Sequence, residues 1–200
     1  MPNPRRLTAV IEIGSTKICC FVARPEKNGW MVTGIGNKGS YGVRNGLVID
    51  VDAAYKTVLA ALHAAEKMAD QAIEEVITLV NGVTPHVEIL HAESAIKTQV
   101  SDEDIGRLQL QIMQETMRED KTLLHFLPHH YIIDSHVHTR DPRKMYGKNL
   151  HLEATCVWGD EAALRNVEAV VASCGLKHRR HVYAPLMGGY STLIDQETAL

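Results

Sequence analysis

Four polar residues near the start of the chain, Gly14-Ser15-Thr16-Lys17, separate two apolar runs and are of types that bind anions. A tight turn between two strands points successive backbone N–H groups outward, and a glycine lets a ligand approach the backbone closely. Two hydroxyls and an ammonium group would add donors for a phosphate. The alternative is a plain hairpin turn, because such residues are common in turns. A Walker A loop is excluded, because that loop leads from a strand into a helix.

A second candidate for chemistry is a group of histidines in the middle of the chain. Two of them, His136 and His138, are expected on one face of a strand, since side chains alternate along a strand. Metal-dependent amidohydrolases use such a pair, but their barrel needs about 250 residues, more than this chain has. The alternative is the solvated face of an antiparallel sheet, and we predict no metal site. The histidines of the group are His125, His129, His130, His136 and His138.

Composition limits the classes of protein to consider. The chain has 200 residues, of which 45% are hydrophobic and 22% charged, so one domain or two small ones are expected. A net charge of −3 gives no basic excess for a nucleic-acid partner. Four cysteines without a C-x-x-C pair argue against a zinc ribbon and favour free thiols in a reducing compartment. The lack of a long apolar run and of a signal peptide predicts a cytoplasmic location.

The elements that would position the polar turn belong to an α/β unit. A helix from Asp50 or Asp52 to about residue 69 has one apolar face and an acidic capping residue. A helix that crosses between strands implies that those strands are parallel. The glycines between residues 36 and 46 are expected to prevent a regular element there. Strands are predicted at residues 8–13, 18–23, 30–35 and 76–80.

The middle of the chain has the pattern of a small inserted unit, and the end returns to a strand–helix order. Ser101 and Asp104 form a capping box before an amphipathic helix. Asp160 is expected to cap a later helix that Gly175 ends, and Pro185 suits the first turn of a last helix. Strands are predicted at residues 131–137, 150–158 and 181–183, with a basic loop at residues 139–149.

Four segments carry a resemblance to a known family. Residues 11–17 resemble the first phosphate motif of the actin/Hsp70/sugar-kinase superfamily, and in detail that of the FtsA family of bacterial cell-division actin homologues. Residues 42–50 are similar to that family's G-x-x-x-G-x-[IV]-x-D stretch, and residues 128–134 to its IPQEYxID segment. Residues 175–191 resemble the end of its first lobe. Each motif is weak alone, but their order and spacing cover nearly the whole chain.

The resemblance implies an α/β fold built from two subdomains. An actin-like, ribonuclease-H-like subdomain, called 1A in this family, would comprise residues 1–84 and 159–200. A small α+β subdomain of SHS2 type, called 1C, would be inserted at residues 85–158, in place of the usual inserted subdomain of actin.

The resemblance also implies ATP with Mg²⁺ in a cleft between two lobes. Gly14, Ser15, Thr16 and Lys17 would hold the phosphates, and Glu12 would lie near the metal. The superfamily usually has aspartate at the position of Glu12, so nucleotide binding is expected more than efficient hydrolysis, and no catalytic residue is assigned. The second phosphate loop and the adenosine motif would follow residue 200, so this chain would hold one lobe only, with weak or absent ATP binding.

By resemblance, the parent protein is a scaffold of bacterial division at the cytoplasmic face of the inner membrane. It would form filaments, tether the FtsZ ring through regions beyond residue 200, and recruit FtsN and other division proteins through subdomain 1C. Its contact with the membrane would need a C-terminal amphipathic helix that also lies beyond residue 200. Two alternatives remain: a pilus-assembly actin homologue, and a sugar-kinase-like phosphotransferase, which would need an acidic base in the cleft.

Overall fold

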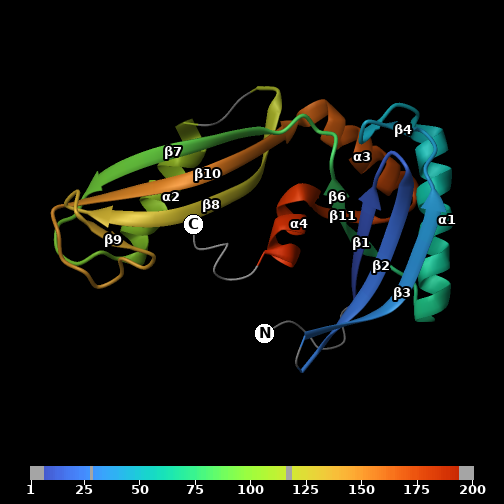
Figure 1. The fold of residues 1–200 in the computed structure, drawn as a ribbon, viewed down its shortest axis with the longest axis horizontal. Coiled ribbons are helices and arrows are strands. Elements are labelled where there is room, and N and C mark those ends of the chain that lie inside the picture. Colours follow the sequence, from blue (N-terminus) through green and yellow to red (C-terminus); the bar gives the residue numbers. More distant parts are fainter. Residues whose placement is uncertain (1–6, 28, 116–118, 194–200) are drawn as a thin grey trace. The chain divides into compact units, whose positions relative to one another are not determined.

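The computed structural model describes residues 7–27, 29–115 and 119–193, so the N-terminal segment 1–6 lies outside the described residues. The chain divides into two compact units, one formed by Met1–Thr84 and Asp160–Leu200 and the other by Pro85–Gly159. Each unit has its own sheet (Figure 1). Of the described helices, none has the length and apolar character needed to cross a membrane.

The first unit is built on a five-stranded sheet with the order β11-β6-β1-β2-β3. The first three strands pair antiparallel in succession, and β6 pairs parallel with both β1 and β11. This arrangement confirms the predicted hairpin and the parallel pairing that the crossover helix implied. The strands are β1 (Thr8–Ile13), β2 (Lys17–Glu26), β3 (Gly29–Gly39), β6 (Glu75–Val80) and β11 (Lys177–Tyr183).

Two capped helices, α1 (Val51–Ala69) and α3 (Glu161–Ser173), contact each other beside this sheet (Figure 1). The side chain of Asp50 accepts a hydrogen bond from the backbone N–H of Ala53 at 3.0 Å, so Asp50, one of the two predicted candidates, is the N-cap of α1. Asp160 caps α3 in the same way, through the N–H of Ala163 at 3.0 Å. The last helix, α4 (Ala184–Thr192), begins at β11 with Pro185 in its first turn, as predicted.

The glycine-rich stretch differs from its prediction, because β3 continues through it to Gly39. A Cβ atom at Gly36 would overlap the carbonyl oxygen of Ala61, and one at Gly34 would overlap that of Ala65. These glycines therefore mark the close approach of α1 to the strand, and they do not break the strand. Beyond Gly39, two short strands, β4 (Val43–Arg44) and β5 (Leu47–Val48), form a separate ribbon.

The second unit is a four-stranded sheet with the order β7-β10-β8-β9 and one helix, α2 (Asp102–Glu115). The helix buries Ile105, Leu108 and Ile112 in the core of this unit. Its predicted capping box is present, since Ser101 Oγ accepts from the N–H of Asp104 and the Asp104 carboxylate accepts from the N–H of Ser101. The strands are β7 (His86–Ala95), β8 (Lys121–Ile133), β9 (Val137–Thr139) and β10 (Asn149–Asp160).

The predicted single strand over residues 131–137 is wrong, because the chain turns after Ile133. Asp134 and Ser135 have positive φ angles of 50° and 66°, which belong to a turn. The Asp134 carboxylate accepts from the backbone N–H groups of Lys148 at 2.8 Å and of Asn149 at 2.9 Å, and these bonds stabilise the turn. His136 therefore lies in the turn and does not share a strand face with His138.

Candidate functional site

The polar turn connects β1 to β2 and is closed by its own backbone. Ile13 pairs with Ile18 across the hairpin, and the N–H of Gly14 donates to the carbonyl of Lys17 at 3.2 Å. A Cβ atom on Gly14 would lie 2.9 Å from that carbonyl oxygen, so this tight turn favours glycine. Ser15, Thr16 and Lys17 are exposed, so their side chains are available to a ligand.

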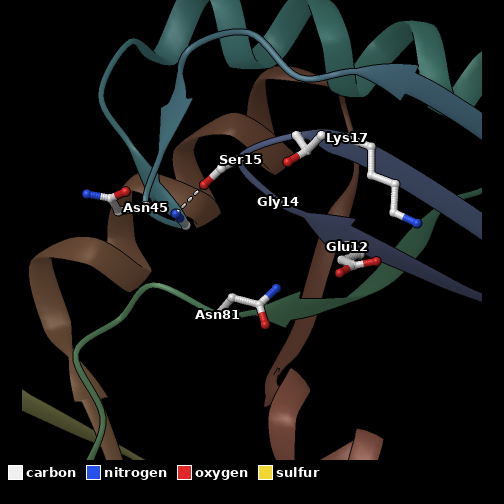
Figure 2. Close-up of a pocket in the computed structure, with 8 residues that line it drawn as sticks. Glu12, Gly14, Ser15, Lys17, Asn45 and Asn81 are labelled. Atoms are coloured by element: carbon white, nitrogen blue, oxygen red, sulfur yellow. Dashed lines mark hydrogen bonds between the residues drawn. The ribbon is translucent and has the colours of Figure 1, made fainter.

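A second segment, around Asn45 and Gly46, lies against the turn. The backbone N–H of Gly46 donates to Ser15 Oγ at 2.7 Å (Figure 2). Because the serine oxygen accepts in this bond, its own O–H remains free to donate elsewhere. Gly46 has a φ of 74°, and a side chain there would overlap the backbone of Gly82. Gly46 and Gly82 thus allow their two backbone segments to pack against each other. These segments form one side of the site.

Between these segments lies a pocket of about 350 Å³. All five residues that the sequence analysis singled out line it: Glu12, Gly14, Ser15, Thr16 and Lys17. Three lining residues were missed, namely Asn45, Gly46 and Asn81. Asn45 and Gly46 lie within the glycine-containing segment 42–50, and Asn81 directly follows a strand that runs parallel to β1. No pattern in the sequence indicated that these residues lie beside the polar turn.

The position of the pocket fits its polar lining. Glu12 pairs with Leu79 of the parallel strand β6, so Glu12 and Asn81 lie at the carboxyl ends of two neighbouring parallel strands. Ligands of open α/β sheets bind outside the carboxyl ends of parallel strands. Lys17, the Ser15 hydroxyl and the amides of the turn are donors for an anion, whereas the Glu12 carboxylate suits a cation that accompanies it. The pocket can therefore hold a polyanion together with a divalent cation.

The middle histidines do not meet as one group of metal ligands among the described residues. His129 hydrogen bonds to Thr155, and the His130 and His138 rings lie 5.3 Å apart between centroids with their planes tilted by 37°. His136, as noted, belongs to a turn.

Among the described residues, one group of three possible metal ligands lies elsewhere, in the first unit: Glu168, His178 and His181. Burial lowers the pKa of His178, against the opposing effects of Glu168 and the backbone of Arg180. Burial, together with the neighbouring His178, also lowers the pKa of His181, although Glu168 opposes the shift. Burial thus favours the neutral form of both imidazoles.

Comparison with known proteins finds similarity to the FtsA cell division proteins. Residues 80–158 match a family model described as the SHS2 domain inserted in FtsA. FtsA of Agrobacterium fabrum is 30% identical over 206 residues, which cover 97% of this chain and 46% of that protein. FtsA of Neisseria meningitidis serogroup B is 28% identical, covering 100% of this chain and 49% of its own length. The chain is a relative of the FtsA cell division proteins.

This FtsA relative spans about half the length of the curated relatives it matches. Its fold is the predicted one, an actin-like α/β unit together with an SHS2 domain. A solved PilM–PilN type IV pilus biogenesis complex agrees with this fold, with a TM-score of 0.61 over 94% of this chain and 50% of that chain. Its sequence identity of 13% supports a shared fold and no more.

Proposed function

We propose that this FtsA relative acts in bacterial cell division and contributes the first phosphate-binding segment of an actin-like nucleotide site. The observation that supports this proposal is the convergence of Glu12, Gly14 and Lys17 on one pocket, in a chain similar to FtsA over nearly all its length. The pilus-assembly alternative is weaker, because its support is likeness of fold alone.

In this proposal the ligand is ATP with Mg²⁺. The N–H groups of the turn, the Ser15 hydroxyl and the Lys17 ammonium bind phosphate oxygens, and Glu12 faces the metal. Glutamate is longer than the aspartate usual at this position of the superfamily, so we expect binding to exceed turnover. The donor set suits phosphates, and one carboxylate suits a cation that keeps most of its water ligands.

The wider role is proposed for the whole protein to which these residues belong. It would assemble into filaments at the cytoplasmic face of the membrane, contact FtsZ through regions beyond residue 200, and contact FtsN and other division proteins through residues 85–158. The support is the match of residues 80–158 to the SHS2 domain of FtsA. Sedimentation velocity over a range of concentrations tests self-association of this chain, and a monomer at every concentration would contradict it.

The nucleotide proposal is tested by calorimetric titration with Mg-ATP up to millimolar concentration. We expect saturable binding that weakens by roughly 10–100-fold in Lys17→Ala, because a charge-assisted hydrogen bond contributes about 1.5–3 kcal/mol. Lys56→Ala is the matched control, since Lys56 is an exposed lysine on α1 that does not line the pocket. Equal affinities of the two variants would contradict the proposed site, whereas no saturable binding to either would agree with a chain that holds only one lobe of the cleft.

A further inference from the structure

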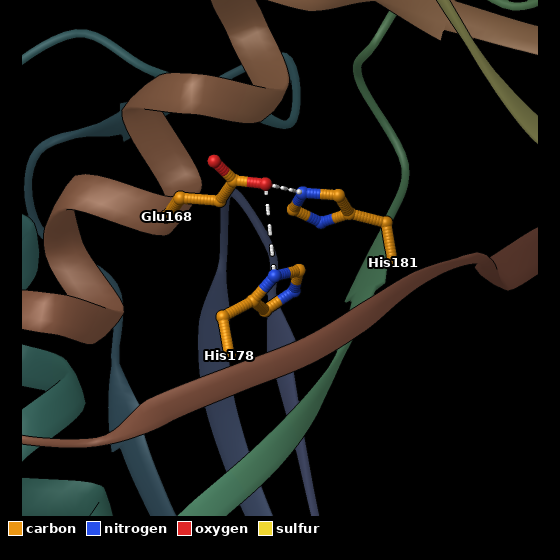
Figure 3. Close-up of side chains that lie close together, drawn as sticks. All are labelled: Glu168, His178 and His181. Carbon is orange, nitrogen blue, oxygen red and sulfur yellow. Dashed lines mark hydrogen bonds and ion pairs between the residues drawn. The ribbon is translucent and has the colours of Figure 1, made fainter.

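A carboxylate and two imidazoles from separate elements meet beside the sheet of the first unit (Figure 3). Glu168 Oε1, from α3, lies 3.1 Å from His181 Nε2 and 3.6 Å from His178 Nδ1, both of β11. The His181 side chain is 7% exposed and that of His178 16%, whereas that of Glu168 is 47% exposed. The group is thus buried on its histidine side and open to solvent at the carboxylate.

A β-bulge brings the two histidines to the same face of the strand. They lie three positions apart in the sequence, and in a regular strand this spacing would put their side chains on opposite faces. The pairing of β11 with β6 shifts between His178 and Arg180, so that His178 lies opposite Val76 and His181 opposite Thr78. Bulges often re-aim a side chain toward a functional site.

Thr78 closes the group on the side away from Glu168. Its Oγ1 lies 3.0 Å from His178 Nε2 and 2.8 Å from His181 Nδ1. The threonine is fully buried, and both imidazoles use their second nitrogen on it. This is the arrangement found around metal-bound histidines, whose other nitrogen donates to an oxygen that sets the orientation of the ring.

Protons alone do not satisfy the group in its neutral state. A neutral imidazole has one N–H, a hydroxyl has one O–H, and an ionised carboxylate only accepts. The two histidines and Thr78 bring three protons, which match the three contacts within hydrogen-bond distance. The fourth contact, between His178 Nδ1 and Glu168 Oε1 at 3.6 Å, is left without a proton. An added proton or a cation between the carboxylate and the imidazoles can supply what is missing. With a cation there, both N–H groups donate to Thr78 Oγ1, which has two lone pairs.

We propose that Glu168, His178 and His181 bind one divalent transition-metal ion, with Zn²⁺ as the expected ion. Two imidazoles and one carboxylate are a common ligand set for zinc, and the exposed carboxylate side leaves room for water as a fourth ligand. Ligand atoms about 2.1 Å from a tetrahedral ion lie about 3.4 Å apart, close to the 3.1 Å and 3.6 Å between Glu168 Oε1 and the two imidazole nitrogens. The 3.6 Å contact of His178 is too long for a hydrogen bond.

Metal at this site would join helix α3 to the edge strand β11. Because the ligands come from both elements, the folded chain binds the ion more tightly than the unfolded chain, and binding raises the melting temperature. The site is separate from the phosphate pocket in its residues, so this inference does not depend on the nucleotide proposal.

The test is titration of the metal-free chain with Zn²⁺ alone, followed by competition with a chromophoric chelator. We expect one saturable equivalent and a rise in melting temperature. Thr78→Val removes the oxygen that orients both rings and should weaken binding roughly 10–100-fold, and Glu168→Gln should weaken it at least as much. Substituted Co²⁺ should give visible absorption bands of a four- or five-coordinate site, and these should disappear in Glu168→Gln.

The matched control replaces the other close histidine pair, His130→Gln with His138→Gln, and should leave the Zn²⁺ affinity unchanged. Glu168 is exposed, so Glu168→Gln keeps the test valid even if a substitution of buried Thr78 prevents folding. Absence of a saturable equivalent would overturn the proposal. So would equal affinity in the Glu168→Gln variant, or loss of binding in the control.

Discussion

At the scale of single residues, burial decides which reactive side chains take part in chemistry. Cys20 lies fully buried in β2, and desolvation, with added repulsion from Glu66 and Cys19, raises the pKa of its thiol to about 12. Burial likewise raises the pKa of Cys174 to about 11. A thiol reacts through its thiolate, so both cysteines are poor nucleophiles at neutral pH. Lys17 and Ser15, by contrast, remain exposed at the pocket beside the β1–β2 turn.

We predict that Cys20 resists alkylation in the folded chain. Because its pKa rises from 9.0 to about 12, the thiolate fraction at pH 8 falls about 1000-fold relative to the unfolded chain. A pulse of iodoacetamide followed by peptide mass spectrometry measures this, with the chain in guanidinium chloride as the reference. Labelling of Cys20 at equal rates in the two conditions would show that the thiol is not buried as described.

At the scale of elements, the close packing of a strand against a helix depends on glycines, which have no side chain. Gly34 and Gly36 let β3 approach the backbone of α1 at Ala65 and Ala61. The helix buries Val58 and Leu62 against the sheet, so this approach also closes the core. A sequence pattern of repeated glycines therefore has two possible meanings, a loop or a close contact, and the neighbouring element decides between them.

We predict that Gly36→Ala destabilises the fold by about 1–3 kcal/mol or more, because the added methyl group overlaps the Ala61 carbonyl oxygen. Gly39→Ala is the matched control on the same strand, since a Cβ atom there meets nothing within 4 Å. The free energy of unfolding from urea titrations measures both changes. If the two variants were equally stable, the close approach of α1 to β3 would be wrong.

At the scale of the whole molecule, the chain leaves the first unit and returns to it at neighbouring positions. The backbone N–H of Asp160 donates to the carbonyl of Val83 at 2.9 Å, so the two ends of the first unit meet there. Within the second unit, His86 pairs with Trp158 at the ends of β7 and β10. We propose on this basis that residues 85–158 are an inserted subdomain, 1C, within subdomain 1A.

This proposal predicts that replacing residues 85–159 by two glycines leaves the first unit folded. The ends at Val83 and Asp160 are already joined by a hydrogen bond, so a short linker spans them with little loss of conformational entropy. Circular dichroism and a cooperative thermal transition measure the outcome. A deletion of residues 76–159 removes strand β6 and serves as the unfolded control. Non-cooperative melting of the first variant, as in the control, would contradict the insertion.

The sequence by itself determined the helix starts and the polar hairpin turn. The starts of three helices could be predicted, because a capping side chain hydrogen bonds to backbone groups only a few residues away. The capping residues are Asp50, Asp160 and the Ser101–Asp104 box. The hairpin at Gly14 is equally local, since its glycine and polar residues lie between two apolar runs that pair with each other. The turn at Asp134 escaped prediction, because its carboxylate bonds to N–H groups at Lys148 and Asn149, distant in the chain.

Only the tertiary structure decided how separate segments complete a site. Asn81 reaches the pocket beside the β1–β2 turn because β6 runs parallel to β1, and Gly46 reaches it through its bond to Ser15. Glu168 meets His178 and His181 because a bulge in β11 turns both rings to the side of α3. Neither a bulge nor a contact across the sheet leaves a periodic signal in the sequence, because both depend on which strands become neighbours.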